Sequence, residues 1–202
     1  MQIVSGVFHP LLMAVYMSAI LAHYLPEAYA PYPQQMAWKL VAGFFLLTAF
    51  FPALIVYGLY LFTPWVTHLE LHERKERVLP FLILIGYYFM AGKFLVLDLG
   101  LGSMIQVLLI SAVVLIGILV IINTRLKISI HCSAVWALAG YSLILAFQFP
   151  STAFMQLALT LVVIAGWVGT SRLYLGYHQP KEVWAGTIFG FTYSMLVGYL
   201  FI

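Results

Sequence analysis

The chain has 202 residues, of which 64% are hydrophobic and only 7% carry a formal charge. Since about a quarter of the residues in a soluble domain are charged, this composition excludes a protein whose whole surface faces water. The net charge of +3 does not indicate a nucleic-acid partner, because most basic residues lie in short loops between apolar runs. Those runs are long and unbroken, which favours helices over a transmembrane β-barrel. We therefore predict an all-α polytopic membrane bundle, with residues 1–202 forming a single domain.

A helix needs about 20 apolar residues to cross the hydrocarbon core of a membrane. Seven segments approach this length, so we expect six to seven transmembrane helices. They cover about residues 4–24, 38–62, 80–98, 104–123, 132–149, 152–170 and 183–202. The dipeptide His9-Pro10 predicts a kink or an interfacial start in the first segment, because proline removes a backbone donor.

Eleven of the fifteen Asp, Glu, Lys and Arg residues fall into three clusters. These clusters are residues 70–77, Arg125 with Lys127, and Arg172 with Lys181 and Glu182. Two expected spans separate the first cluster from the second, and two more separate the second from the third. Because an even number of crossings returns the chain to the same side, we predict that all three clusters meet at one membrane surface.

The third cluster belongs to residues 171–182, which read SRLYLGYHQPKE between two apolar runs. Pro180 suits the first turn of a helix, and a helix starting there would bring His178 and Glu182 together on one face. Glu182 would then accept a hydrogen bond from one ring nitrogen of His178 and leave the other free to attack. Arg172 suits a bound phosphate. An ordinary basic loop with an interfacial histidine is the alternative interpretation.

The second cluster leads into the segment KISIH, residues 127–131, at the start of the fifth expected span. Ser129 is placed to cap that helix, whose N-terminus would offer N–H groups and a positive dipole end to an anion. His131 would lie at the mouth of this anion site, in position to donate a proton. A capping serine beside an interfacial histidine explains the same pattern.

The first cluster contains three cations, Arg74, Lys75 and Arg77, which suit a clamp on phosphate oxygens. His68 and His72 are four residues apart, so they would suit a metal ion if this segment were helical. A solvated, charged helix end is the other interpretation of such a run.

The third motif resembles a signature of the type 2 phosphatidic acid phosphatase (PAP2) superfamily. That signature, Ser-Arg-x5-His-x3-Asp, is matched by Ser171, Arg172, His178 and Glu182, with glutamate in place of aspartate. The chain is therefore identified as a divergent, bacterial-type member.

Two further PAP2 signatures are matched less well. The second, Pro-Ser-Gly-His, is matched only by Ser129 and His131, since isoleucines occupy positions 128 and 130. The first, Lys-x6-Arg-Pro, is not matched in register, and a basic run at 74–77 followed by Pro80 stands in its place.

The resemblance implies a membrane phosphatase that removes phosphate from a lipid phosphate or an isoprenoid diphosphate. It implies that His178 forms a phosphohistidine, that Glu182 orients it, and that His131 protonates the leaving oxygen. The residues that would hold phosphate oxygens are Arg172, Ser129, Arg74, Lys75, Arg77 and Lys127. No metal and no cofactor are implied, and the partners would be the lipid substrate and membrane lipids.

The resemblance also favours a bacterial inner membrane with the site on the extracytoplasmic face, whereas the positive-inside rule would put the basic face in the cytoplasm. Two other functions are compatible with the sequence. One is a non-catalytic binder or transporter of anionic lipids that uses a degenerate PAP2 site. The other is a haem or metal protein built on histidines, although His68, His72, His131 and His178 all cluster at one expected membrane edge.

Overall fold

The structure, a computed structural model, describes residues 1–68 and 74–201. Within these residues the chain is helical and has no strand, which confirms the predicted all-α fold. Six helices in this part of the chain are long and apolar enough to cross a membrane, so the protein is an integral membrane protein. They are Gln34–Phe62, Glu76–Asp98, Ser103–Arg125, Ile130–Gln148, Thr152–Tyr174 and Pro180–Phe201.

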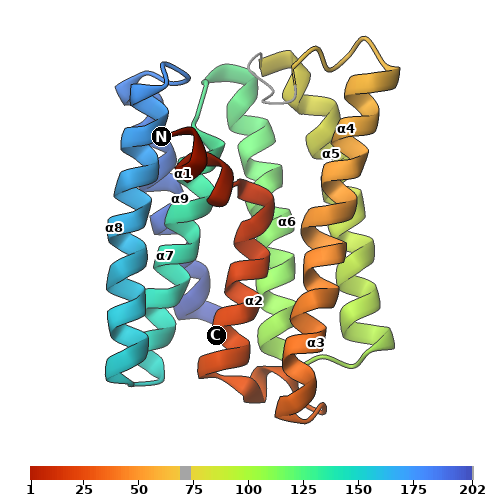
Figure 1. Cartoon of the computed structure of the whole chain (residues 1–202), viewed down its shortest axis with the longest axis vertical. Helices are drawn as coiled ribbons and strands as arrows, with labels where there is room; N and C mark the ends of the chain where they lie inside the picture. Colours follow the sequence, from red (N-terminus) through yellow and green to blue (C-terminus); the bar gives the residue numbers. More distant parts are fainter. Residues whose placement is uncertain (69–73, 202) are drawn as a thin grey trace. The chain divides into compact units, whose positions relative to one another are not determined.

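The chain divides into two compact units, one of which combines Met1–Met13 with Ile128–Ile202. Figure 1 shows its long helices as neighbours, with the N-terminal α1 beside α8. The elements of this unit are α1 (Gln2–Val7), the 3₁₀ helix η1 (Pro10–Leu12), α7 (Ile130–Gln148), α8 (Thr152–Tyr174) and α9 (Pro180–Phe201).

The other unit is Ala14–Lys127. The π-helical segment η3 joins α3 to α4 in one continuous span, and a second π-helical segment, η4, extends α5. Its elements are α2 (Met13–Tyr24), the 3₁₀ helix η2 (Pro26–Tyr29), α3 (Gln34–Phe45), η3 (Leu46–Phe50), α4 (Phe51–Phe62), α5 (Arg74–Lys93), η4 (Phe94–Asp98) and α6 (Ser103–Arg125). The expected single domain over residues 1–202 stays a prediction.

The first expected span, 4–24, is not one helix. Helix α1 ends at Val7, and the apolar helix that follows covers only Pro10–Tyr24, which is shorter than the six candidate spans. His9 has φ −68° and ψ 140°, an extended conformation that the residue before a proline favours. The break predicted at His9-Pro10 is therefore confirmed, and the helix that follows it is not among the six candidate spans.

Helix α9 packs against α7 through small residues at every fourth position: Gly186, Gly190, Ser194 and Gly198. A Cβ atom added at Gly190 would overlap the backbone of Ser133 on α7. Small residues at this spacing let two membrane helices approach closely. The packing therefore brings the N-terminal ends of α7 and α9 together, and both carry residues that the sequence singled out.

Candidate active site

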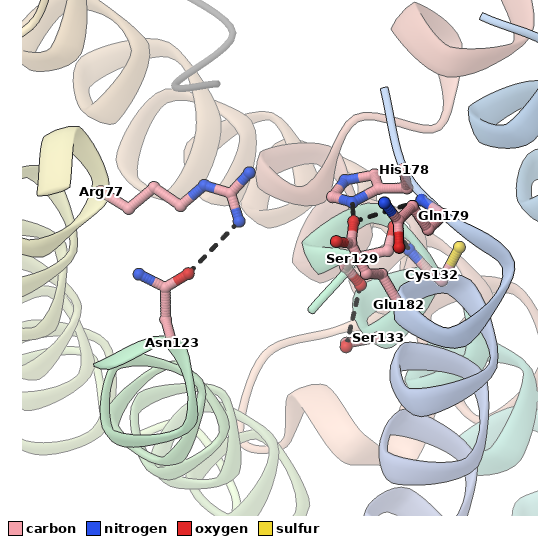
Figure 2. A network of polar contacts seen from close by, with 8 residues as sticks. All are labelled: Arg77, Asn123, Ser129, Cys132, Ser133, His178, Gln179 and Glu182. Carbon is pink, nitrogen blue, oxygen red and sulfur yellow. Dashed lines mark hydrogen bonds and ion pairs between the residues drawn. The ribbon is translucent and has the colours of Figure 1, made fainter. Parts of the chain in front are cut away.

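The centre of the site is a histidine–carboxylate pair at the start of α9. His178 Nδ1 lies 2.7 Å from Glu182 Oε2, and both side chains are buried. The backbone N–H of Gln179 also donates to Glu182 Oε2, at 3.3 Å. Figure 2 shows the ring and the carboxylate turned toward each other. Since a carboxylate accepts, Nδ1 carries the hydrogen and the lone pair of the neutral ring lies on Nε2.

This geometry follows from the local sequence. Helix α9 begins at Pro180, as predicted, so that the side chain of Glu182 in the first turn reaches back to His178. Upstream, Gly176 has φ +69°, a left-handed conformation that glycine adopts without strain. Its N–H and that of Tyr177 close the end of α8 by donating to the carbonyls of Leu173 and Arg172. The chain therefore turns sharply between Arg172 and His178.

The start of α7 lies against this pair. Ser129 is the N-cap of α7, and its Oγ accepts a hydrogen bond from the N–H of Cys132 at 3.4 Å, which confirms the predicted cap. The N–H of Ser129 donates to the backbone carbonyl of Glu182 at 3.1 Å. A hydroxyl that accepts through a lone pair keeps its own proton for donation. The second and third motifs therefore meet directly within the first unit.

Arg172 is buried near the end of α8, with only 5% of its surface exposed. Its Nη1 donates to Ser5 Oγ at 2.6 Å, and its guanidinium carbon lies 4.4 Å from the centroid of the Tyr177 ring. Both contacts are made with neutral groups, so they orient the guanidinium and leave its positive charge intact.

His131 is half-buried in the first turn of α7, where it meets a residue that the sequence did not suggest as part of the site. The rings of His131 and His9 meet edge to face, with centroids 5.3 Å apart and an interplanar angle of 88°. Desolvation by neighbouring protein atoms, and after it the charge of Arg172, lower the pKa of His9, which nevertheless is an exposed residue. Both effects favour the neutral form of its ring.

Ser5 and His9 are the residues that sequence reasoning missed, because His9 was interpreted only as a break before Pro10. The sequence feature that could have pointed to them is the presence of two polar residues, a serine and a histidine, four residues apart in an apolar run. That spacing would place both residues on one helix face, but α1 ends at Val7, before His9. Only the fold shows that Ser5 contacts Arg172 and that His9 contacts His131.

The first cluster belongs to the other unit. Arg77 is buried at the start of α5, and its Nη1 donates to Asn123 Oδ1 of α6 at 3.4 Å (Figure 2). Glu76 accepts hydrogen bonds from the N–H and the hydroxyl of Thr67. The neighbouring ends of α5 and α6 confirm the parity argument inside this unit. Whether these cations reach the phosphate site stays a prediction.

The remaining predicted residues are described less fully. Arg74 and Lys75 begin α5, but their side chains lie outside the described part of the chain. His72 lies outside the described residues as well. Lys127 is the last residue of the second unit, two positions before Ser129. Among the described residues, no three histidine, cysteine or carboxylate side chains gather as metal ligands would.

The fold and the site together define an integral membrane protein with a buried histidine–carboxylate pair at the start of a transmembrane helix. The PAP2 superfamily model matches residues 123–201, which contain α7, α8 and α9 and the second and third motifs. This part of the chain is thus similar to the PAP2 superfamily, and the likeness supports phosphatase-type activity on phosphate esters. The match leaves out the first basic cluster. No curated protein and no solved structure matches the chain.

Proposed function

We propose that the protein hydrolyses a lipid phosphate or an isoprenoid diphosphate through a phosphohistidine on His178. The observation that carries this proposal is the 2.7 Å contact between His178 Nδ1 and Glu182 Oε2, inside the stretch that matches the PAP2 family. A buried imidazole held by a carboxylate in one tautomer presents a nucleophilic nitrogen.

In the first step, the lone pair of His178 Nε2 attacks phosphorus and a P–N bond forms. The bond from phosphorus to the leaving oxygen breaks, and that oxygen takes its electron pair and a proton from protonated His131. The phosphorylated ring is cationic, and the negative charge of Glu182 stabilises it through the Nδ1 hydrogen bond. The first product is the lipid alcohol or, from a diphosphate, the lipid monophosphate.

In the second step, water attacks the phosphohistidine. Neutral His131 takes a proton from this water, the P–N bond breaks, and its electron pair returns to His178 Nε2. Inorganic phosphate leaves, and both histidines recover their starting protonation states.

Charge stabilisation comes from cations and N–H groups, since phosphoryl transfer depends mainly on positioning and electrostatics. Arg172 is proposed to bind the phosphate oxygens, and Ser129 to contribute its hydroxyl and the helix end that it caps. We assign supporting roles in phosphate binding to Lys127, which precedes α7, and to the cations in the first turn of α5, which are Arg74, Lys75 and Arg77. This mechanism requires no metal, so a chelator should leave turnover unchanged.

The direct test is phosphate release by the purified protein from phosphatidate, phosphatidylglycerophosphate, isoprenoid diphosphates and lipid A phosphates. We expect release from at least one of them, and none from His178→Ala. His23→Ala is a matched control, because His23 is an exposed histidine on α2, outside the proposed machinery. Tight binding of these lipids without turnover would show a degenerate lipid binder or transporter instead.

The site is proposed to face the extracytoplasmic side of a bacterial inner membrane. Cys132 is buried, so a single introduced cysteine reports its own accessibility. Lys181 is exposed beside the site, and Gln148 is exposed at the far end of α7. A membrane-impermeant thiol reagent on intact spheroplasts should label Lys181→Cys and not Gln148→Cys. The reverse pattern would place the site in the cytoplasm.

A further inference from the structure

Three residues of the N-terminal segment, spaced four apart, each contact a motif residue. Met1 and Ser5 lie at the start of and within α1, and His9 lies beyond its end. The carbonyl of Met1 accepts from Ser171 Oγ at 2.8 Å, Ser5 Oγ accepts from Arg172, and His9 meets the ring of His131. These contacts join positions about 120 to 170 residues apart in the chain, and all lie within the first unit.

The contact at Ser5 determines the orientation of Arg172. Ser5 is buried, and its hydroxyl lies 2.6 Å from Nη1, while the ring of Tyr177 covers the guanidinium. A carboxylate in the place of Ser5 would neutralise the guanidinium and compete with phosphate. A hydroxyl instead orients the side chain and preserves its charge for an anion.

The contact at His9 acts on the proposed proton donor. His9 Nδ1 accepts the N–H of Leu11 at 3.3 Å, which caps η1 and makes neutral His9 the tautomer with hydrogen on Nε2. The ring therefore has a fixed direction when it meets His131 edge to face. The lowered pKa of His9 keeps a second full positive charge away from protonated His131.

Resting on the function proposed above, we propose that residues 1–9 form a third wall of the active site, beside the start of α7 and the turn from α8 into α9. In this wall Ser5 positions Arg172 for phosphate, and His9 positions His131 for proton transfer. Neither residue touches the reacting atoms, so both are positioning residues. The wall lies outside residues 123–201, which the family model matches. It is therefore a feature of this chain's own N-terminal segment.

The proposed role of Ser5 is tested by measuring the affinity of the protein for inorganic phosphate. Ser5→Ala should weaken calorimetric binding of inorganic phosphate about three- to tenfold, which is the effect of losing one hydrogen bond of ordinary net strength. In turnover, KM should rise while kcat changes little. Ser5→Thr restores the hydroxyl and should recover the affinity. The matched control is Ser18→Ala, which removes another buried serine hydroxyl, one that meets Tyr29 in the second unit.

Two substitutions of His9 distinguish the contact of its ring with His131 from its hydrogen bond to the N–H of Leu11. His9→Asn keeps an acceptor for the Leu11 N–H and loses the ring, whereas His9→Phe keeps a ring and loses the acceptor. We expect kcat on phosphatidate to fall about tenfold in His9→Asn, within the range of general acid catalysis, and less in His9→Phe. With 4-nitrophenyl phosphate, whose leaving group needs no proton, the rate of the pre-steady-state burst of 4-nitrophenol should resemble wild type in both variants, because His131 acts there only in the later attack of water. His23→Ala is the histidine control.

The possible outcomes separate the two proposals. Unchanged phosphate binding in Ser5→Ala, or a 4-nitrophenol burst slowed as much as the lipid turnover in His9→Asn, would overturn the third wall while leaving the phosphatase intact. Higher activity in His9→Asn than in His9→Phe would show that the cap, and not the ring, matters. Wild-type protein that binds phosphate without releasing any from lipids would sink the phosphatase and the His9 role together. The Ser5 role would still be decided by the binding measurement.

Discussion

Two regions of the chain carry buried charged residues at helix ends, and they differ in what those residues meet. In the first unit, His178 meets the carboxylate of Glu182, so that the proposed nucleophile is paired with a group that fixes its tautomer. In the second unit, Arg77 meets the neutral amide of Asn123 across α5 and α6. The first arrangement sets up bond making, whereas the second fixes a cation in place.

The difference shows that a sequence motif predicts a side-chain contact best when both residues lie at the start of one helix. The His178–Glu182 contact arises within one helix start, and the family match covers it. The Arg77–Asn123 contact joins two helices and lies largely outside the match, which begins at residue 123. We therefore expect substitutions in the first region to change kcat and substitutions in the second to change KM.

The largest effect is expected from His178→Ala. Loss of a covalent nucleophile removes the reaction path itself, so kcat should fall at least about ten-thousandfold. Phosphate release under saturating lipid measures this, with His23→Ala as the control. Activity within tenfold of wild type would remove His178 from the role of nucleophile.

Glu182→Gln should have the next largest effect. Glutamine keeps the size of the side chain but loses the charge that stabilises the phosphorylated ring, and its amide no longer fixes one tautomer. We expect kcat to fall about a hundredfold, less than the loss for a triad aspartate. Glu182→Asp, which restores the family's own residue type, should recover part of kcat. An aspartate variant as inactive as the glutamine variant would contradict the orienting role.

Gly190→Ala tests the packing that joins α7 to α9. The added methyl group would overlap the backbone of Ser133, so we expect a loss of about 1–3 kcal/mol in the free energy of unfolding. Gly117→Ala on α6 is the control, because no atom lies within 4 Å of its added Cβ atom. Thermal unfolding in detergent compares the two variants. Equal melting temperatures would show that the approach of α9 to α7 is not tight.

Arg77→Gln should have the smallest effect on turnover. Because Arg77 is proposed only to support phosphate binding, KM should rise about threefold to tenfold while kcat stays within about twofold of wild type. Initial rates over a range of lipid concentrations separate the two constants. A fall in kcat comparable to that of Glu182→Gln would erase the distinction between the two regions.

The features that could be predicted from the sequence are local. Pro180 marked the start of α9, Ser129 marked the start of α7, and the four-residue spacing brought His178 to Glu182. Pro10 signalled the break in the first apolar run, but composition alone could not show that the following helix is too short to count as a candidate span.

The features that could not be predicted depend on long-range packing. Ser5 meets Arg172 across 167 positions, and no periodicity in the sequence specifies such a contact. The partner of Arg77 on α6 lies 46 positions away in the sequence, which is also too far for a local pattern to specify. Pro80 suggested a span beginning there, but the helix begins at Arg74, because the tertiary structure tolerates a proline after the first turns.

The most direct test of the central claim is to trap the phosphoenzyme. Protein mixed with ³²P-labelled lipid phosphate would be quenched in alkali, which preserves phosphohistidine, and digested for peptide mapping. The account predicts label on the peptide that contains His178 in wild type, and none in His178→Ala. Label on a different residue, or rapid turnover with no labelled protein at any quench time, would contradict it.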